Sequence, residues 1–179
     1  MNERRIVPLG PELAAVCGPM TFPAYRHLLD LSPGPRHAGA PGQPTIVPLG
    51  AVALEGNKIV GLALAERPLE GEGDAELLSV YTEPGSRGTG VATALVEGIE
   101  DSLRGMGVPR VQAVYMNRRA DTAALERVFV KRGWEAPVLR TITVRFTPEE
   151  AATTTWYGRM RLSADFEIFA WSDLGERER

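Results

Sequence analysis

The pattern of hydrophobic positions changes its period along one stretch near the middle of the chain. Residues 76–82 are mostly apolar, include Val, Tyr and Thr, and have the length of a strand. From Val91 to Met106 the apolar residues recur at the i, i+3/i+4 spacing of an amphipathic helix. Glycine-rich residues lie between the two patterns. The stretch therefore predicts a strand that turns through a tight loop directly into a helix.

Similar patterns predict further elements on both sides of this stretch. The expected strands are 5–7, 50–54, 58–65, 110–115 and 140–146, and the expected helices begin at 11, 23 and 121. The turn Glu55-Gly56-Asn57 joins two strands, so residues 51–82 predict an antiparallel meander of three strands. The strand at 110–115 follows a strand–helix connection and is expected to run parallel to 76–82.

Two segments do not fit this regular alternation. Residues 32–48 are dense in proline and glycine, which predicts neither a helix nor a central strand there. At the other end, the pattern predicts a helix at 148–160 and a strand at 166–171, with aromatic residues that favour docking. We therefore expect a domain over 1–146 and an extension over 147–179. The extension is either a docked helix and strand or the start of an incomplete second domain, and a homodimer through it is possible.

Composition narrows the class of protein. The 179 residues are 44% hydrophobic and 24% charged, which suits one globular domain. A net charge of −3 gives no electrostatic reason to expect nucleic acid or an anionic membrane as a partner. A single cysteine excludes an intramolecular disulfide, and two distant histidines give no metal-ligand spacing. The start resembles no signal peptide and no apolar run spans a bilayer, so we expect a cytoplasmic protein. The lack of metal-ligand spacing leads us to expect no metal.

The glycine-rich loop is the candidate binding site. The backbone N–H groups of Gly88, Thr89, Gly90 and Val91 are expected at the helix N-terminus, where they have no intrahelical partners and favour phosphate. Glycines let a ligand approach the backbone closely. A P-loop requires a lysine that this loop lacks, and a dinucleotide loop requires a glycine where Thr93 stands.

The loop does fit the pattern Arg87-x-x-Gly90-x-Ala92, with a strand before it. It resembles the acetyl-CoA signature of the GCN5-related N-acetyltransferases, [Gln/Arg]-x-x-Gly-x-[Gly/Ala]. The run Lys131-Arg-Gly-Trp134 resembles the closing pattern of the same family. The resemblance covers about residues 5–146. It implies an α/β (α+β) fold: a mixed, mostly antiparallel sheet of about six to seven strands, flanked by about four helices, with splayed parallel strands at the cofactor site.

The resemblance also implies an activity, the transfer of acetyl from acetyl-CoA to a primary amine by direct attack. The pyrophosphate would lie on the loop, and the pantetheine arm along the end of the preceding strand. A backbone N–H near Tyr81 would stabilise the oxyanion, and Glu76 would be the base, with Glu83 as an alternative. The cofactor-binding candidates are Val80, Tyr81, Thr82, Arg87, Gly88, Thr89, Gly90, Val91, Ala92 and Asn117.

The sequence departs from the family pattern at the general acid. The usual tyrosine falls at Phe129, which has no proton to donate, so Tyr115 or Tyr81 would have to replace it. This departure keeps a second hypothesis open, an acyl-CoA-binding module with a regulatory or scaffolding role. A nucleotide-binding βα protein is a third hypothesis.

Overall fold

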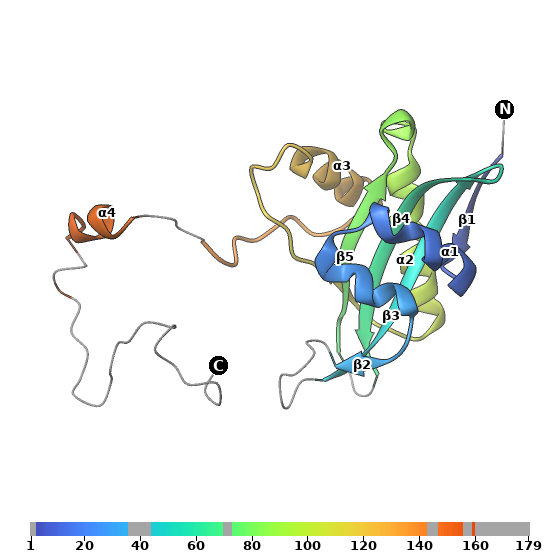
Figure 1. Cartoon of the computed structure of the whole chain (residues 1–179), viewed down its shortest axis with the longest axis horizontal. Coiled ribbons are helices and arrows are strands. Elements are labelled where there is room, and N and C mark those ends of the chain that lie inside the picture. Colours follow the sequence, from blue (N-terminus) through green and yellow to red (C-terminus); the bar gives the residue numbers. More distant parts are fainter. Residues whose placement is uncertain (1–2, 36–43, 70–72, 143–146, 156–158, 160–179) are drawn as a thin grey trace. The chain divides into compact units, whose positions relative to one another are not determined.

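The computed structural model describes residues 3–35, 44–69, 73–142, 147–155 and 159 (Figure 1). The chain divides into two units, Met1–Ala136 and Pro137–Arg179. The described strands all belong to the first unit. In the second unit, the described residues form one short helix, α4 at Pro148–Ala152, which is shorter than the expected helix at 148–160.

A mixed sheet of six strands forms the centre of the first unit. Its order is β1-β3-β4-β5-β6, and the short β2 also pairs with β3. β5 and β6 are parallel and the other pairs are antiparallel, which confirms the predicted mixed sheet. The strands are β1 at Arg4–Pro8, β2 at Gly34–Pro35, β3 at Thr45–Glu55, β4 at Lys58–Pro68, β5 at Ala75–Thr82 and β6 at Val111–Ala113.

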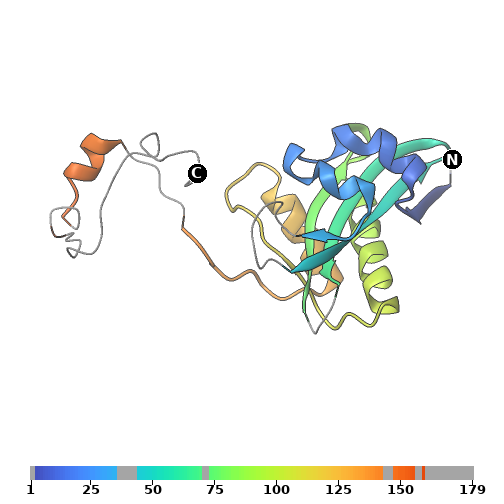
Figure 2. The same ribbon diagram turned by 60° about the horizontal axis from the view of Figure 1, so that its bottom comes forward.

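Helices cover both faces of this sheet (Figures 1 and 2). One face carries α1 at Pro11–Cys17 and the 3-10 helices η1 at Gly18–Met20 and η2 at Pro23–Asp30. The other face carries α2 at Val91–Gly105, which follows the 3-10 turn η3 at Pro84–Ser86, and α3 at Thr122–Arg132. Side chains alternate between the two cores along the central strands: Ala63 of β4 packs toward α2, and Leu62 and Leu64 pack toward α1.

A carboxylate at the middle of α2 holds the end of α3. Glu100, 12% exposed, accepts hydrogen bonds from Arg132 at Nε (3.1 Å) and Nη2 (2.6 Å) and from the indole N–H of Trp134 (2.7 Å). Glu97, one turn earlier and 51% exposed, accepts from Arg132 Nη1 at 2.8 Å. Trp134 stacks on Phe129 with ring centroids 4.4 Å apart. These contacts fix α3 against α2, and with it the connection that follows β6.

Several predicted boundaries are wrong. β3 begins at Thr45 and includes Pro48, although the proline-rich segment 32–48 was not expected to hold a central strand. Proline is compatible there because Pro48 falls between the residues of β3 that pair with β2 and those that pair with β1. The described part of the expected strand 140–146, residues 140–142, is not a strand, and 143–146 lie outside the described residues. The expected strand at 166–171 also lies outside them.

β5 contains one extra residue, which changes how the rest of this strand pairs with β4 and β6. Leu64 of β4 pairs with Ser79, whereas its neighbour Ala65 pairs with Leu77, so Leu78 has no partner and forms a β-bulge. The parallel pairing with β6 also stops at Leu77. From Leu78 to Thr82, β5 therefore continues along β4 without pairing with β6. The predicted splay of the two parallel strands is present.

Candidate active site

The loop between β5 and α2 presents a row of unsatisfied donors. The backbone N–H groups from Gly88 to Thr93 donate no hydrogen bond to any residue in the described part of the chain, and the first helical bond of α2 runs from Ala94 N–H to Gly90 O (3.1 Å). Gly88 and Gly90 have positive φ angles of 76° and 87°. A Cβ at either position would meet nothing within 4 Å. The loop is thus an open stretch of backbone at a helix N-terminus, which suits an anion.

Two arginines hold this loop in place. The Arg4 guanidinium donates to the carbonyl oxygen of Thr89 (2.8 Å) and to its hydroxyl oxygen (2.9 Å), and it is itself anchored on Glu55 at 2.7 Å. Arg87 donates from Nε to the carbonyl of Thr82 (3.3 Å). The Thr89 hydroxyl in turn donates to Ser86 O at 2.7 Å. β1 therefore fixes the loop from one side, and β5 fixes it from the other.

At the end of β5, alternate backbone groups point to the edge of the strand that has no partner strand. Glu83 N–H donates to Val60 O on β4 (2.9 Å), and in an extended strand alternate residues point their polar groups to the same side. By this alternation the N–H of Tyr81 points to β4, whereas those of Val80 and Thr82 point away from it. The contact from Arg87 to the Thr82 carbonyl agrees with this direction. Val80 and Thr82 thus have backbone groups that a ligand can pair with.

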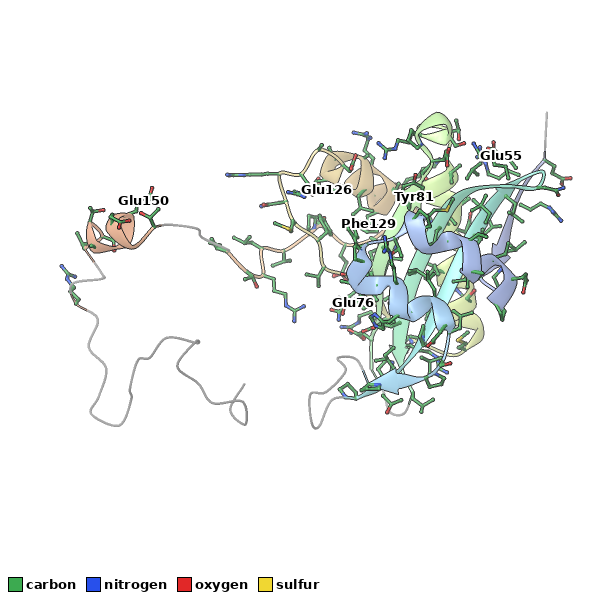
Figure 3. All side chains as sticks on the ribbon, in the orientation of Figure 1. Glu55, Glu76, Tyr81, Glu126, Phe129 and Glu150 are labelled. Carbon is green, nitrogen blue, oxygen red and sulfur yellow. The ribbon has the colours of Figure 1, made fainter. Side chains whose placement is uncertain are left out.

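The bulge also decides which side chains of β5 lie beneath η2. Glu76, Ser79 and Tyr81 pair with Glu66, Leu64 and Leu62, the residues of β4 on the η2 face (Figure 3). The buried Ser79 hydroxyl accepts a hydrogen bond from Thr21 at 3.3 Å. If the same sequence ran as a regular strand with no bulge, Ser79 and Tyr81 would lie on the face opposite to Glu76.

A pocket of about 280 Å³ lies between η2 and this face of the sheet. Tyr25, His27 and Leu28 line it from η2, and Glu66, Glu76 and Leu78 line it from β4 and β5. Glu66 is only 4% exposed, and it lies directly opposite Glu76 in the strand register. Both carboxylates already interact with other groups of the protein. The pocket thus combines two acidic groups, a phenol and an imidazole next to the bulge of β5.

Tyr115 follows β6 and lies beside α3. Its hydroxyl donates to Glu126 Oε1 at 3.4 Å, and its ring is 5.8 Å from that of Phe129. Burial, with the neighbouring Glu126 carboxylate, raises the pKa of Tyr115 above its ordinary value of 10.0. The phenol is therefore protonated at neutral pH. Phe129, in the position where the sequence comparison expected a tyrosine, is 6% exposed and belongs to the hydrophobic core.

Comparison with known proteins decides the family. Residues 21–134 match the acetyltransferase (GNAT) family, which is well over half of the chain. This protein is a GNAT acetyltransferase. Members of the family are acetyl-CoA-dependent N-acetyltransferases. No curated protein matches the chain.

Solved structures show the same GNAT fold. An aminoglycoside acetyltransferase, HMB0005, from an uncultured soil metagenomic sample is 19% identical with a TM-score of 0.55, over 80% of this chain and 99% of that one. The ribosomal-protein-alanine N-acetyltransferase of Brucella melitensis biovar Abortus 2308 is 17% identical with a TM-score of 0.54, over 80% and 100%. The aminoglycoside N-acetyltransferase AAC(6')-Iy in complex with CoA is 16% identical with a TM-score of 0.55, over 80% and 95%.

The GNAT fold brings some of the expected site residues together and separates others. The loop residues from Arg87 to Ala92 lie next to the end of β5, as the bond from Arg87 to Thr82 shows. Asn117 is exposed in the loop after β6 and makes no hydrogen bond within the described residues. That loop is tied to the start of α3 by the Thr122 hydroxyl, which accepts from Arg119 N–H and donates to Met116 O. Asp121, the residue before α3, makes no side-chain cap.

Three site features were not expected from the sequence. Arg4 lies far from the loop in the chain, and its contact with Thr89 depends on the pairing of β1 with β3. Glu66 becomes the partner of Glu76 only once the bulge sets the register. The buried hydroxyl oxygen of Thr82 has no hydrogen-bond partner among the described residues, and it lies opposite Gly61 beneath the start of α2.

Two general properties complete the description. The described helices include none that is both long enough and apolar enough to cross a bilayer. Within the same residues, no group of three or more His, Cys, Asp or Glu side chains is placed to hold a metal ion.

Proposed function

We propose that this chain transfers the acetyl group of acetyl-CoA to a primary amine by direct attack. The observation that carries the proposal is the row of unpartnered N–H groups from Gly88 to Thr93, next to the unpaired edge of β5. The row suits a pyrophosphate, and the edge suits a chain of amides. Together they match the two ends of coenzyme A in the order that the GNAT family uses.

The cofactor is held in two parts. Its pyrophosphate accepts hydrogen bonds from the loop amides of Gly88 to Ala92, supported by the positive end of the α2 dipole. Its pantetheine arm pairs with the outward backbone groups of Val80 and Thr82, as an added strand does.

The reaction then proceeds in one displacement. The amine nitrogen attacks the thioester carbonyl carbon, the C–N bond forms, and the C–S bond breaks to release the thiolate of coenzyme A. Glu76 accepts the proton that the amine loses, directly or through a water molecule. The strand direction favours the N–H of Val80, next to Tyr81, as the donor to the oxyanion. Tyr115, whose raised pKa keeps it protonated, supplies a proton to the thiolate.

One observation favours a second candidate function. The family's tyrosine position is Phe129, which is buried in an aromatic stack with Trp134 and cannot donate a proton. An acyl-CoA-binding module without turnover would tolerate this residue. It would bind acetyl-CoA on the same loop and edge, so the two functions differ in turnover and not in cofactor binding.

A thiol-release assay separates the two functions. Purified protein is mixed with acetyl-CoA and a panel of amines, and free coenzyme A is measured with a thiol reagent, with melting temperature recorded in parallel. The transferase raises free thiol with at least one amine, whereas the binding module shows stabilisation by acetyl-CoA and no release. Glu76→Gln should lower kcat by about 10²–10⁴-fold, the usual contribution of a general base. Glu83→Gln, directly after the opposite end of β5, is the comparison variant, and a loss confined to it would assign the base to Glu83.

A further inference from the structure

The pocket beneath η2 is lined by two carboxylates, one more than a general base requires. Glu66 and Glu76 lie directly opposite each other on β4 and β5, where cross-strand Cβ atoms are about 4.5–5.5 Å apart. One carboxylate is enough to accept the proton of an attacking amine. The second, 4% exposed, contributes a negative charge to the same cavity without being needed for that step.

The rest of the lining also suits a cation. Tyr25 contributes an aromatic ring, which attracts a cation over its face, and His27 contributes an imidazole that can accept a hydrogen bond. Leu28 and Leu78 provide apolar walls for a short hydrocarbon linker. Among the described residues that line the pocket there is no lysine or arginine. An acceptor with a carboxylate would therefore meet two glutamates among these residues.

The position of the pocket connects it to the acetyl group. Leu78, which lines the pocket, is the bulged residue at which β5 leaves β6. Val80, the proposed oxyanion donor, is two residues further along the same strand. An amine in the pocket therefore lies on the η2 side of the strand edge along which the pantetheine arm would run.

We propose that the pocket selects an acceptor that carries a second cationic group, a short diamine or polyamine, with Glu66 holding the distal cation while Glu76 faces the reacting nitrogen. This inference rests on the proposed acetyl transfer and adds the class of acceptor. Since both carboxylates already have interactions inside the protein, the distal ammonium joins or replaces those interactions. Glu66 is a specificity residue in this scheme and takes no proton.

Matched acceptors test the proposal without any mutation. Putrescine and cadaverine are compared with butylamine and pentylamine in the thiol-release assay. Wild-type kcat/KM should be about 10- to 100-fold higher for each diamine, the range that a charge-assisted hydrogen bond provides. Equal values for diamine and monoamine, or a preference for an acceptor with a carboxylate, would overturn the proposal.

Variants of the pocket residues test whether Glu66 causes the preference for diamines. Glu66→Gln should reduce the ratio of diamine to monoamine kcat/KM to near unity, mainly by raising KM for the diamines, and leave the acetyl-CoA affinity unchanged. Glu12→Gln, an exposed carboxylate on α1 outside the pocket, is the control. Should Glu66→Gln not fold, Tyr25→Leu gives a second reading, with a selective loss for diamines. An equal loss for both classes of acceptor would assign Glu66 a structural role and refute the proposal.

Calorimetry distinguishes a failure of this proposal from a failure of the proposed function. If no amine is acetylated, putrescine and butylamine are titrated into the complex of the protein with coenzyme A. Tighter binding of putrescine that is lost in Glu66→Gln supports the pocket assignment, even though transfer is then excluded. Equal binding, or none, overturns the pocket assignment as well.

Discussion

Gly90 gives the sharpest test of the cofactor loop, because the structure separates its conformational role from its binding role. Its φ angle is 87°, and a Cβ built on it meets nothing within 4 Å. Gly107, after the end of α2, has a φ angle of 74° and the same open surroundings. Alanine at either position therefore meets the same backbone strain and no steric clash within the protein. The two residues differ only in what lies next to them.

The first expected effect is a loss of folding stability caused by backbone strain. A left-handed conformation costs a residue with a Cβ about 1–2 kcal/mol, so Gly90→Ala and Gly107→Ala should both destabilise the protein by that amount. For a chain of this length the melting temperature should fall by about 2–8 °C in both variants. Differential scanning calorimetry without ligand measures this loss. A much larger fall in only one variant would mean that the two sites are not matched.

The second expected effect is a weaker affinity for coenzyme A. In Gly90→Ala the new methyl group occupies the open space over the loop, where the pyrophosphate would approach the N–H groups. Losing one or two hydrogen bonds to a charged group costs about 1.5–3 kcal/mol each, so Kd for coenzyme A should rise by at least about tenfold. Isothermal titration calorimetry should show this rise in Gly90→Ala and an unchanged Kd in Gly107→Ala. The same Kd in both variants would refute the assignment of the pyrophosphate to this loop.

Three further predictions concern the residues around the site. Arg4→Gln removes both bonds to the loop and should raise Kd for coenzyme A by about 3- to 10-fold in a calorimetric titration with kcat unchanged, whereas the exposed Arg5→Gln should change neither. Glu100→Ala removes the acceptor of the partly buried Trp134 indole and of two Arg132 nitrogens, and it should cost about 2–4 kcal/mol in urea unfolding, against about 0–1 kcal/mol for the exposed Glu97→Ala. The pKa of Tyr115 is raised in the folded state, so its protonated phenol stabilises the fold below pH 10, and this contribution falls as the pH rises further. Comparing the free energy of unfolding of the wild type and Tyr115→Phe at alkaline pH measures this contribution.

Local patterns were sufficient where each element is determined by its own residues. The change of period before Val91 predicted β5, the loop and α2, and the Gly56-Asn57 turn predicted the β3–β4 hairpin, which the structure confirms. The parallel arrangement of β6 also followed from its connection. The predicted roles of the site residues remain proposals, although the loop donors and the edge of β5 lie together as the resemblance implied.

The sequence was insufficient where tertiary pairing decides the outcome. Pro48 indicated a break, yet β3 passes through it because neither β1 nor β2 pairs with that residue. Asp121 has the residue type of an N-cap, but the hydroxyl of Thr122 makes the local hydrogen bonds and Asp121 Oδ1 lies 3.9 Å from Arg87 instead. The bulge at Leu78 has no glycine or proline to indicate it, so the register of Glu76 was not predictable.

That single extra residue connects the cofactor side of the site to the acceptor side. The bulge ends the pairing with β6, which leaves the backbone of Val80 and Thr82 open to the pantetheine arm. It also reverses the alternation of side chains, which places Tyr81 on the same face as Glu76 and the pocket beneath η2. A deletion of Leu78 would restore regular pairing and let β6 pair with β5 beyond Leu77, while Ser79 and Tyr81 would still lie opposite Leu64 and Leu62 on the η2 face. Binding of the pantetheine arm should therefore be lost in that variant, although the side chains beneath η2 keep their face and no residue with a proposed chemical role has been removed.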